Sequence, residues 1–230
     1  MPKQDVSAII QPGIDLGGFT LMEPTTVLTD IMVTVVCFYA FWKLRKHSRQ
    51  DKVYKFTQVF FLMLGLAAFF GAFFGHGLIH ILTAKFWKLP GWYTSMFAVA
   101  FLERASISHA NQFLPKKLGK FLLGLNVVEL ASLCIIVAIT VQFKYVEIHS
   151  AYGFLVVVFL CHSFSYFKSR DKGSLIFLLN NLTLFAVVFI YNHPVIIHTF
   201  FNHRDLAHLV MCLSCWLIYK GTINLGKSDG

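Results

Sequence analysis

The chain has 230 residues, of which 57% are hydrophobic and only 13% are charged. Soluble domains carry about 25% charged residues, so this composition excludes an ordinary soluble domain and indicates an integral membrane protein. The net charge of +9 does not indicate a nucleic-acid partner, because the basic residues gather in short loops, as the positive-inside rule describes for membrane proteins.

Seven segments of the chain are long and apolar enough to cross a bilayer as a helix, which takes about 20 residues. Pro24 is typical of the first turn of a helix, so we expect the first helix to start there and to run to about residue 42. Later helices are expected at about 56–84, 92–114, 121–142, 151–167, 174–192 and 205–219. We therefore predict an all-α, multi-pass protein with one membrane domain, residues 26–220, between an N-terminal tail (1–25) and a C-terminal tail (221–230).

The basic residues are divided unequally between the two predicted sides of the membrane. The loops after the first, third and fifth helices, with the C-terminal tail, hold fourteen Lys and Arg residues; the N-terminal tail and the other loops hold five. Because cytoplasmic loops are enriched in Lys and Arg, we predict an outer N-terminus and a cytoplasmic C-terminus. The first 25 residues lack the pattern of a cleaved signal peptide, so we expect the first helix to act as its own signal anchor.

Two polar islands fall at the same predicted depth, near the outer side. His76 and His80 are four residues apart in the second helix, and Asp205 and His208 are three apart in the seventh, so each pair shares a helical face. Ionisable groups at membrane depth usually face a protein interior or a wet cavity. Imidazoles with a carboxylate suit zinc, so we predict a zinc site with the ligands His76, His80, Asp205 and His208.

Two carboxylates near the start of the first helix lie at this level and are our candidates for catalytic residues. Glu23 or Asp30 could orient a ligating histidine or act as a general base, beside a zinc-bound water with a pKa near 7. His203, next to Asp205, is an alternative ligand that could replace His80 or Asp205.

Other polar residues lie deeper in the predicted helices. Glu103 and Arg104 are adjacent near the middle of the membrane, and adjacent helical residues do not face each other, so each needs its own partner. Glu129 is the candidate partner of Arg104. His109 and His162, toward the cytoplasmic side, are interpreted as structural.

The pattern of seven spans, an outer N-terminus and histidines on the second and seventh helices resembles the alkaline ceramidase-like (CREST) superfamily, which includes the alkaline ceramidases and the progestin and adipoQ receptors. The stretch from Gly71 to His76, followed by Leu89-Pro90, resembles its second-helix motif, and the stretch from Arg204 to His208 resembles part of its seventh-helix motif. The resemblance implies a zinc-dependent amide hydrolase acting on a lipid. It also implies, more loosely, a calcium-type site near Glu23.

The chain departs from the family pattern at three positions. Ala72 stands where the family has a serine, Trp87 lies near the position of its aspartate, and Arg204 replaces the first histidine of the seventh helix. We therefore expect an altered zinc site near the outer face, with hydrolysis of a membrane lipid amide or ester as the reaction.

Two other functions remain open. The first is a receptor-like or assembly subunit, in which the polar residues form a structural network and the partner is a membrane protein or a second copy of the chain. The second is a b-type haem protein with axial histidines from facing helices, such as His76 and His208.

Overall fold

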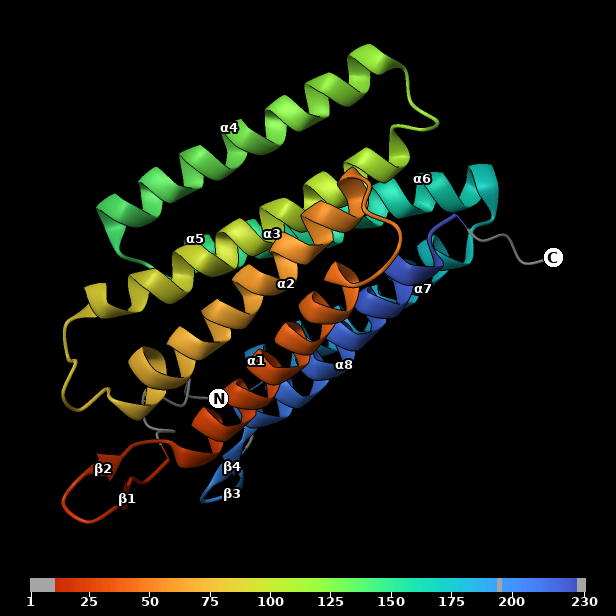
Figure 1. Ribbon diagram of the computed structural model, residues 1–230. Coiled ribbons are helices and arrows are strands. Elements are labelled where there is room, and N and C mark those ends of the chain that lie inside the picture. The colour runs from red at the N-terminus through yellow and green to blue at the C-terminus, as the bar shows by residue number, and fades with distance from the viewer. Residues whose placement is uncertain (1–10, 194–195, 227–230) are drawn as a thin grey trace.

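The computed structural model describes residues 11–193 and 196–226 and consists almost entirely of long helices (Figure 1). In chain order these are α1 (Pro24–Arg45), α2 (Lys52–Phe70) with its π-helical continuation η2 (Gly71–Gly77), α3 (Leu89–Ala110), α4 (Lys116–Thr140), α5 (Lys144–Tyr152), which continues through the π-helical η4 (Gly153–Val158) into α6 (Phe159–Ser169), α7 (Lys172–Asn192) and α8 (His203–Asn224). The short 3₁₀ helix η3 (Lys85–Lys88) precedes α3. The predicted all-α fold is confirmed.

Two small antiparallel hairpins accompany the helices. β1 (Ile14–Asp15) pairs with β2 (Thr20–Leu21), and β3 (Ile196–His198) pairs with β4 (Phe201–Asn202). The first hairpin leads into α1 and the second into α8, so both lie at the same end of the helical bundle (Figure 1).

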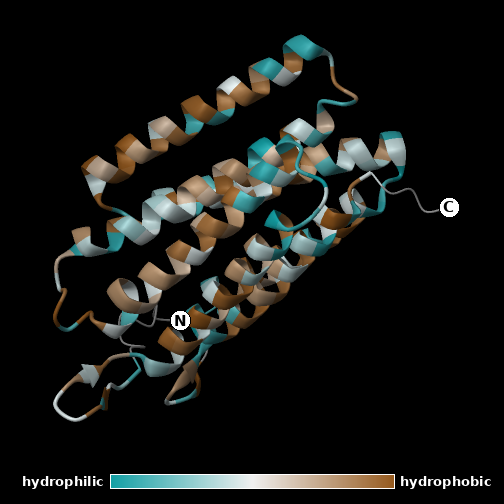
Figure 2. Ribbon diagram, in the orientation of Figure 1, coloured by the Kyte–Doolittle hydropathy of each residue, from teal (hydrophilic) through white to brown (hydrophobic). Residues whose placement is uncertain are grey.

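Within the described residues, six helical segments are long and apolar enough to cross a membrane: α1, α2 with η2, α4, α5 to α6, α7 and α8. Large apolar side chains are exposed along them, among them Phe167 at 72% and Ile139 at 78%, and apolar residues cover much of the helices' length (Figure 2). These features fit a multi-pass membrane protein. The seventh span and the orientation of the termini stay predictions.

Six of the helical segments close into a ring. α1 packs against α2 and α8, α2 against α3, α3 against η4 and α6, α6 against α7, and α7 against α8. α4 lies outside this ring, against α3 and α5 (Figure 1), and only 11% of its most apolar window is buried. α3 is the most enclosed helix because the ring covers one side and α4 the other.

Bulky apolar side chains fill the centre of the ring. The largest fully buried ones include Tyr54, Phe60 and Phe61 of α2, Leu44 of α1 and Phe177 of α7. Burying an aromatic side chain removes 150–250 Å² from solvent, so these residues fix how the helices of the ring pack.

Side-chain caps fix three of the helix starts. Asp51 accepts hydrogen bonds from two backbone N–H groups of α2, and Asp171 accepts one from the backbone of α7. Asn202 and Asp205 form a reciprocal capping box at the start of α8. Each cap satisfies N–H groups that have no partner within the helix.

The second helix is shorter than the sequence predicts. It ends at Gly77 rather than at about residue 84, because η2 contains three glycines and widens into π-helical turns. The backbone N–H of Leu78 bonds to the carbonyl of Phe73, 2.9 Å away, and the chain then turns. His80 therefore lies beyond the helix and is exposed, so the predicted helical face shared by His76 and His80 is wrong.

Other boundaries also differ from the prediction. α5 begins at Lys144 rather than at about residue 151, so His149, expected in a loop, is helical and buried. α1 begins at Pro24, inside the expected tail, and α8 continues to Asn224, past the expected boundary at residue 220.

Candidate metal centre

Four ionisable side chains from α1, η2 and α8 meet at the end of the bundle that carries the hairpins. We call them the histidine–carboxylate cluster: Glu23, Asp30, His76 and His208. α1 packs against both η2 and α8, and Asp30 lies nearly two turns into α1. Glu23 and Asp30 are almost fully buried, while the two histidine side chains are 19% and 17% exposed.

The Asp30 carboxylate faces both imidazoles. Its Oδ1 lies 3.4 Å from Nε2 of His208, and its Oδ2 lies 3.9 Å from Nε2 of His76. Both distances exceed the 2.7–3.2 Å of an ordinary N–H···O hydrogen bond. The shorter one is close to the separation of about 3.3 Å between two ligand atoms on one tetrahedral zinc ion, given zinc–ligand distances of about 2.0–2.1 Å.

The other nitrogen of each imidazole is held by an oxygen acceptor. Nδ1 of His208 lies 3.0 Å from the hydroxyl of Thr29, which itself donates to the carbonyl of Thr26 at 3.1 Å. The Thr29 hydroxyl must therefore accept from Nδ1–H. Nδ1 of His76 lies 2.5 Å from a carboxylate oxygen of Glu23. In its neutral form each imidazole is thus the Nδ1–H tautomer, whose Nε2 lone pair faces the Asp30 carboxylate.

Glu23 is held as an anion between two donors. Its other oxygen accepts from Arg204 at 3.0 Å. Burial raises the pKa of Glu23, but the hydrogen bond from His76 and neighbouring charges, those of Arg204 and Lys88 among them, outweigh burial and hold that pKa below its usual range. The residue has φ +43°, in the left-handed region, a conformation that costs a non-glycine residue about 1–2 kcal/mol. Its two partners hold it in this conformation.

Asp205 serves as a cap. One of its oxygens accepts from Thr26 at 2.8 Å, and the other accepts from Gln11 at 2.6 Å and from the backbone N–H of Asn202 at 2.7 Å. Both oxygens are therefore occupied by donors. This capping role explains why the carboxylate that faces the imidazoles is Asp30 and not Asp205.

Two other predicted ligands lie apart from the cluster. His80 is exposed, and its ring lies 6.5 Å from that of Phe19. His203 is buried, 6.2 Å from the ring of Tyr191, and its Nδ1 has no hydrogen-bond partner among the described residues. Of the predicted ligands and catalytic residues, the structure brings together His76, His208, Asp30 and Glu23.

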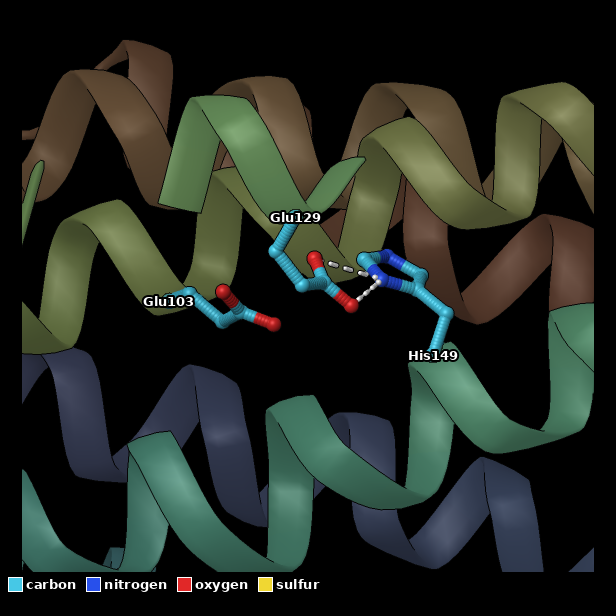
Figure 3. Close-up of side chains that lie close together, drawn as sticks. All are labelled: Glu103, Glu129 and His149. Carbon is cyan, nitrogen blue, oxygen red and sulfur yellow. Dashed lines mark hydrogen bonds and ion pairs between the residues drawn. The ribbon is translucent and has the colours of Figure 1, made fainter. Parts of the chain in front are cut away.

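A second cluster lies deeper in the bundle, between α3, α4 and α5 (Figure 3). We call Glu103, Glu129 and His149 the Glu–Glu–His cluster. One ligand atom of each residue lies within 4.8 Å of the others, and the three could hold a metal ion. Nδ1 of His149 lies 2.8 and 3.0 Å from the two Glu129 oxygens.

The sequence analysis missed His149 because it placed residues 143–150 in a loop. The structure shows one buried helical face there, made by Val146, His149 and Gly153 at positions i, i+3 and i+7. The predicted pairing of Glu129 with Arg104 is wrong, because Glu129 pairs with His149 instead. Arg104 donates to the side chain of Asn126 at 3.2 Å and to the Leu123 carbonyl at 3.4 Å.

A third polar group joins α3, α6 and α7 at the opposite end of the bundle. Ser106 and Ser174 lie 3.2 and 3.1 Å from the two ring nitrogens of His162, and His109 lies 3.3 Å from Asp171. All five side chains are buried. Contacts between these helices are consistent with the structural role predicted for His109 and His162.

Comparison with known proteins identifies one family. No curated protein and no solved structure matches the chain. A family model matches residues 25–227, a span that contains nearly all of the helices described above. The chain therefore belongs to DUF6962, a family of unknown function.

Proposed function

We propose that the protein is a zinc-dependent membrane enzyme of the alkaline ceramidase-like type, with its metal at the histidine–carboxylate cluster. The observation that carries the proposal is that His76 and His208 both direct Nε2 at the Asp30 carboxylate. Two nitrogen lone pairs facing a carboxylate repel it unless a proton or a metal ion lies between them. Zinc has the charge and the ligand preference for this position.

The donor set fits a catalytic rather than a closed zinc site. His76, His208 and Asp30 supply three ligand atoms, and catalytic zinc keeps its fourth position for water or substrate. The imidazoles are partly exposed, which supports access to that position. Zinc bound there would lower the pKa of a water ligand to about 7 and polarise a carbonyl.

Glu23 and Thr29 are positioning residues in this proposal. Each accepts the Nδ1–H of one imidazole, which is the usual arrangement behind a metal-ligating histidine. Arg204 occupies the place of the first histidine in the seventh-helix motif of the resembled family. It cannot ligate a metal there, but it pairs with Glu23, which in turn holds His76. Asp30 then supplies the third ligand.

The substrate class is a membrane lipid with an amide or ester bond. The cluster lies near the end of the bundle, within about two turns of the starts of α1 and α8. On α1, Leu28, Met32 and Val35 expose 59%, 42% and 61% of their surface. These apolar side chains on the helix that carries Asp30 suit the acyl chains of a lipid whose polar linkage reaches the cluster.

Metal analysis tests the site. The purified full-length protein is stripped with a chelator, dialysed against Zn²⁺ and analysed for bound zinc. We expect His76→Ala and His208→Ala to lose an ion that the unaltered protein binds, and His80→Ala, the matched control, to keep it. The metal claim would be overturned if the unaltered protein bound no zinc, or if His80→Ala lost as much zinc as His76→Ala and His208→Ala.

Hydrolysis is tested separately with vesicles that contain fluorescent ceramide-type amides and phospholipid esters. We expect zinc-dependent release of the labelled acyl chain, lost in Asp30→Asn and kept in His80→Ala. Zinc binding without turnover of either class would reject the enzyme while leaving the metal site in place.

A non-enzymatic structural network is the second candidate function. It is favoured by the Arg204–Glu23 ion pair and by the capping role of Asp205, both of which satisfy charges without a ligand. It predicts that His76→Ala and His208→Ala lower the melting temperature and that the unaltered protein binds no metal.

Two other cofactors fit the cluster less well. A haem iron would have to lie between His76 and His208, where both Nε2 atoms face one carboxylate. A calcium ion at Glu23 would compete with the guanidinium of Arg204 for the same oxygen. A visible absorption spectrum separates haem from zinc, because a zinc protein is colourless. A purified protein without visible absorption would exclude haem.

A further inference from the structure

The geometry of the Glu–Glu–His cluster calls for a proton or a metal ion between its members. Nε2 of His149 lies 2.9 Å from the carbonyl of Met96, and a carbonyl only accepts, so Nε2 carries a proton. In the neutral imidazole Nδ1 is then a bare lone pair, directed at both oxygens of Glu129. This contact is favourable only when a proton or a metal ion is shared between the two groups.

Glu103 adds a second carboxylate with an unsatisfied oxygen. The residue is 0% exposed, and its Oε1 has no hydrogen-bond partner among the described residues. Its Oε2 is fixed by Asn126, whose side-chain amide donates at 2.6 Å. Figure 3 shows the carboxylate of Glu103 directed toward that of Glu129. A buried carboxylate oxygen without a partner is costly unless a proton or a metal ion binds it.

The backbone of η4 makes room for that carboxylate. A Cβ atom at Gly153 would lie 2.4 Å from Oε1 of Glu103, closer than any side chain can approach. Gly153 begins the π-helical turns that follow α5, and such turns are frequent at functional sites. The glycine therefore keeps Glu103 within reach of the other two residues.

The neighbouring arginine does not supply the missing charge by direct contact. Arg104 donates to Asn126 and to the Leu123 carbonyl, and its guanidinium lies 5.4 Å from the centre of the Phe56 ring. Two carboxylates, those of Glu103 and Glu129, and the imidazole of His149 thus approach one another where three helices meet. Two carboxylates this close together favour binding of a proton or a metal ion.

We propose that Glu103, Glu129 and His149 bind a divalent transition-metal ion inside the membrane domain, separate from the ion proposed at the histidine–carboxylate cluster. One imidazole nitrogen and two carboxylates are ligands that suit zinc, manganese and iron. The ion ties α4 to the ring, because Glu129 belongs to α4 and the other two ligands belong to α3 and α5. α4 is the helix with the least buried apolar window.

Zinc stoichiometry in the full-length protein tests this proposal independently of the first site. The combined variant His76→Ala and His208→Ala removes the ligands of the histidine–carboxylate cluster. After chelation and dialysis against Zn²⁺, we expect this variant to retain one ion and to lose it when Glu103→Gln is added. Glu147→Gln, which alters an exposed carboxylate of α5, is the matched control and should leave the ion bound.

Hydrogen exchange gives a second readout. We expect α4 of the combined variant to exchange faster after chelation and to regain protection with Zn²⁺, and we expect Glu103→Gln to abolish this response to metal. Absence of bound zinc in the combined variant would overturn the proposal. So would equal zinc in the Glu103 and Glu147 variants, or loss of thermal stability in Glu103→Gln without any change in bound metal. A failure of the first site leaves these outcomes unchanged.

Discussion

A hydrogen bond at one nitrogen of a histidine decides what the other nitrogen can do. Thr29 donates its proton to the carbonyl of Thr26, so its hydroxyl oxygen is an acceptor for His208. This relay fixes the Nδ1–H tautomer and leaves Nε2 as a ligand. Glu23 does the same for His76. His149 has the reverse arrangement, since its Nε2–H donates to Met96 and its Nδ1 faces Glu129.

Removing the Thr29 hydroxyl tests this dependence. Thr29→Val keeps the shape of the side chain but removes the acceptor, so His208 loses its fixed tautomer and orientation. Loss of such a partner typically weakens metal binding about 10–100-fold. We expect a loss in this range in the zinc affinity of the histidine–carboxylate cluster, measured by competition with a chelating dye. Thr140→Val, whose hydroxyl bonds the Ile136 carbonyl within α4, should leave the affinity unchanged.

Asp171 makes the stability of the other end of the bundle depend on pH. Burial raises the pKa of this carboxyl, but hydrogen bonds from His109 and Ser174 and the charge of His109 outweigh it, and the pKa falls well below its usual range. The unfolded chain, with an Asp pKa of about 3.9, therefore binds a proton before the folded protein does. The stability that Asp171 contributes is fully present above that value and is lost as the pH falls below it.

The charge of Asp171 can be removed without removing the cap. Asn is also a good N-cap residue, so Asp171→Asn retains the helix start and loses the charged acceptor. We expect unfolding at pH 7 to become easier by about 1.5–3 kcal/mol, the usual contribution of a hydrogen bond to a charged group. In thermal melts the difference from the unaltered protein should shrink between pH 6 and pH 3. A constant difference would contradict the pKa argument.

At the scale of elements, π-helical turns adjoin both candidate metal clusters. η2 carries His76 near its end, and η4 follows directly after the helix that carries His149. A π-helical turn shifts the register between side chains before and after it. In η2 this shift, with the end of the helix at Gly77, separates His76 from His80. In η4 it starts at the glycine that accommodates Glu103.

Close packing between α7 and α8 depends on a glycine pair. A Cβ atom at Gly173 would lie 2.5 Å from the backbone nitrogen of Leu225 and 2.6 Å from the carbonyl oxygen of Gly221. Backbone atoms cannot move aside as a flexible side chain can. Small residues that let helix backbones approach are typical of membrane bundles.

Alanine substitutions compare this contact with an open position. Gly173→Ala should lower the melting temperature strongly or prevent folding, because α7 and α8 must separate. Gly124→Ala, on α4, meets nothing within 4 Å and replaces a poor helix former, so it should be neutral or stabilising by up to about 1 kcal/mol. Thermal melts in detergent measure both, and equal melting temperatures would contradict the packing described here.

At the scale of the whole molecule, the number of spans depends on α3. This helix has 22 residues, like α1 and α8, but it is not among the six that are apolar enough to span. It nevertheless runs alongside α2 and α4 through the bundle (Figure 1). Its buried polar residues are enclosed by the ring and α4, so it does not need a fully apolar surface.

The position of the termini distinguishes six spans from seven. Seven spans put the two ends of the chain on opposite sides of the membrane, and the excess of basic residues in alternate loops predicts a cytoplasmic C-terminus. We expect a fluorescent reporter fused to the C-terminus to be active in the cytoplasm, and a protease-sensitive tag at the N-terminus to be cleaved from outside intact cells. Both termini on one side would exclude the seventh span.

The sequence by itself determined the class of the protein and most of its helices. Long apolar segments can be stable in a bilayer only as helices or barrels, so the all-α fold and the approximate helix positions follow from composition alone. Depth along each helix also follows from counting residues, which brought Glu23, Asp30, His76 and His208 to one level before any contact was known.

Only the tertiary structure decided which of these side chains meet. The π-helical turns of η2, whose register the apolar pattern does not specify, moved His80 out of the cluster. The oxygens of Asp205 accept hydrogen bonds within the cap of α8 and from Gln11 and Thr26, which lie far away in the sequence, so this carboxylate is not free to face the imidazoles. The Glu–Glu–His cluster joins three helices, and its existence depends on how α4 packs against the ring. Such packing follows from the shapes of many side chains together and cannot be inferred from the spacing of a few residues.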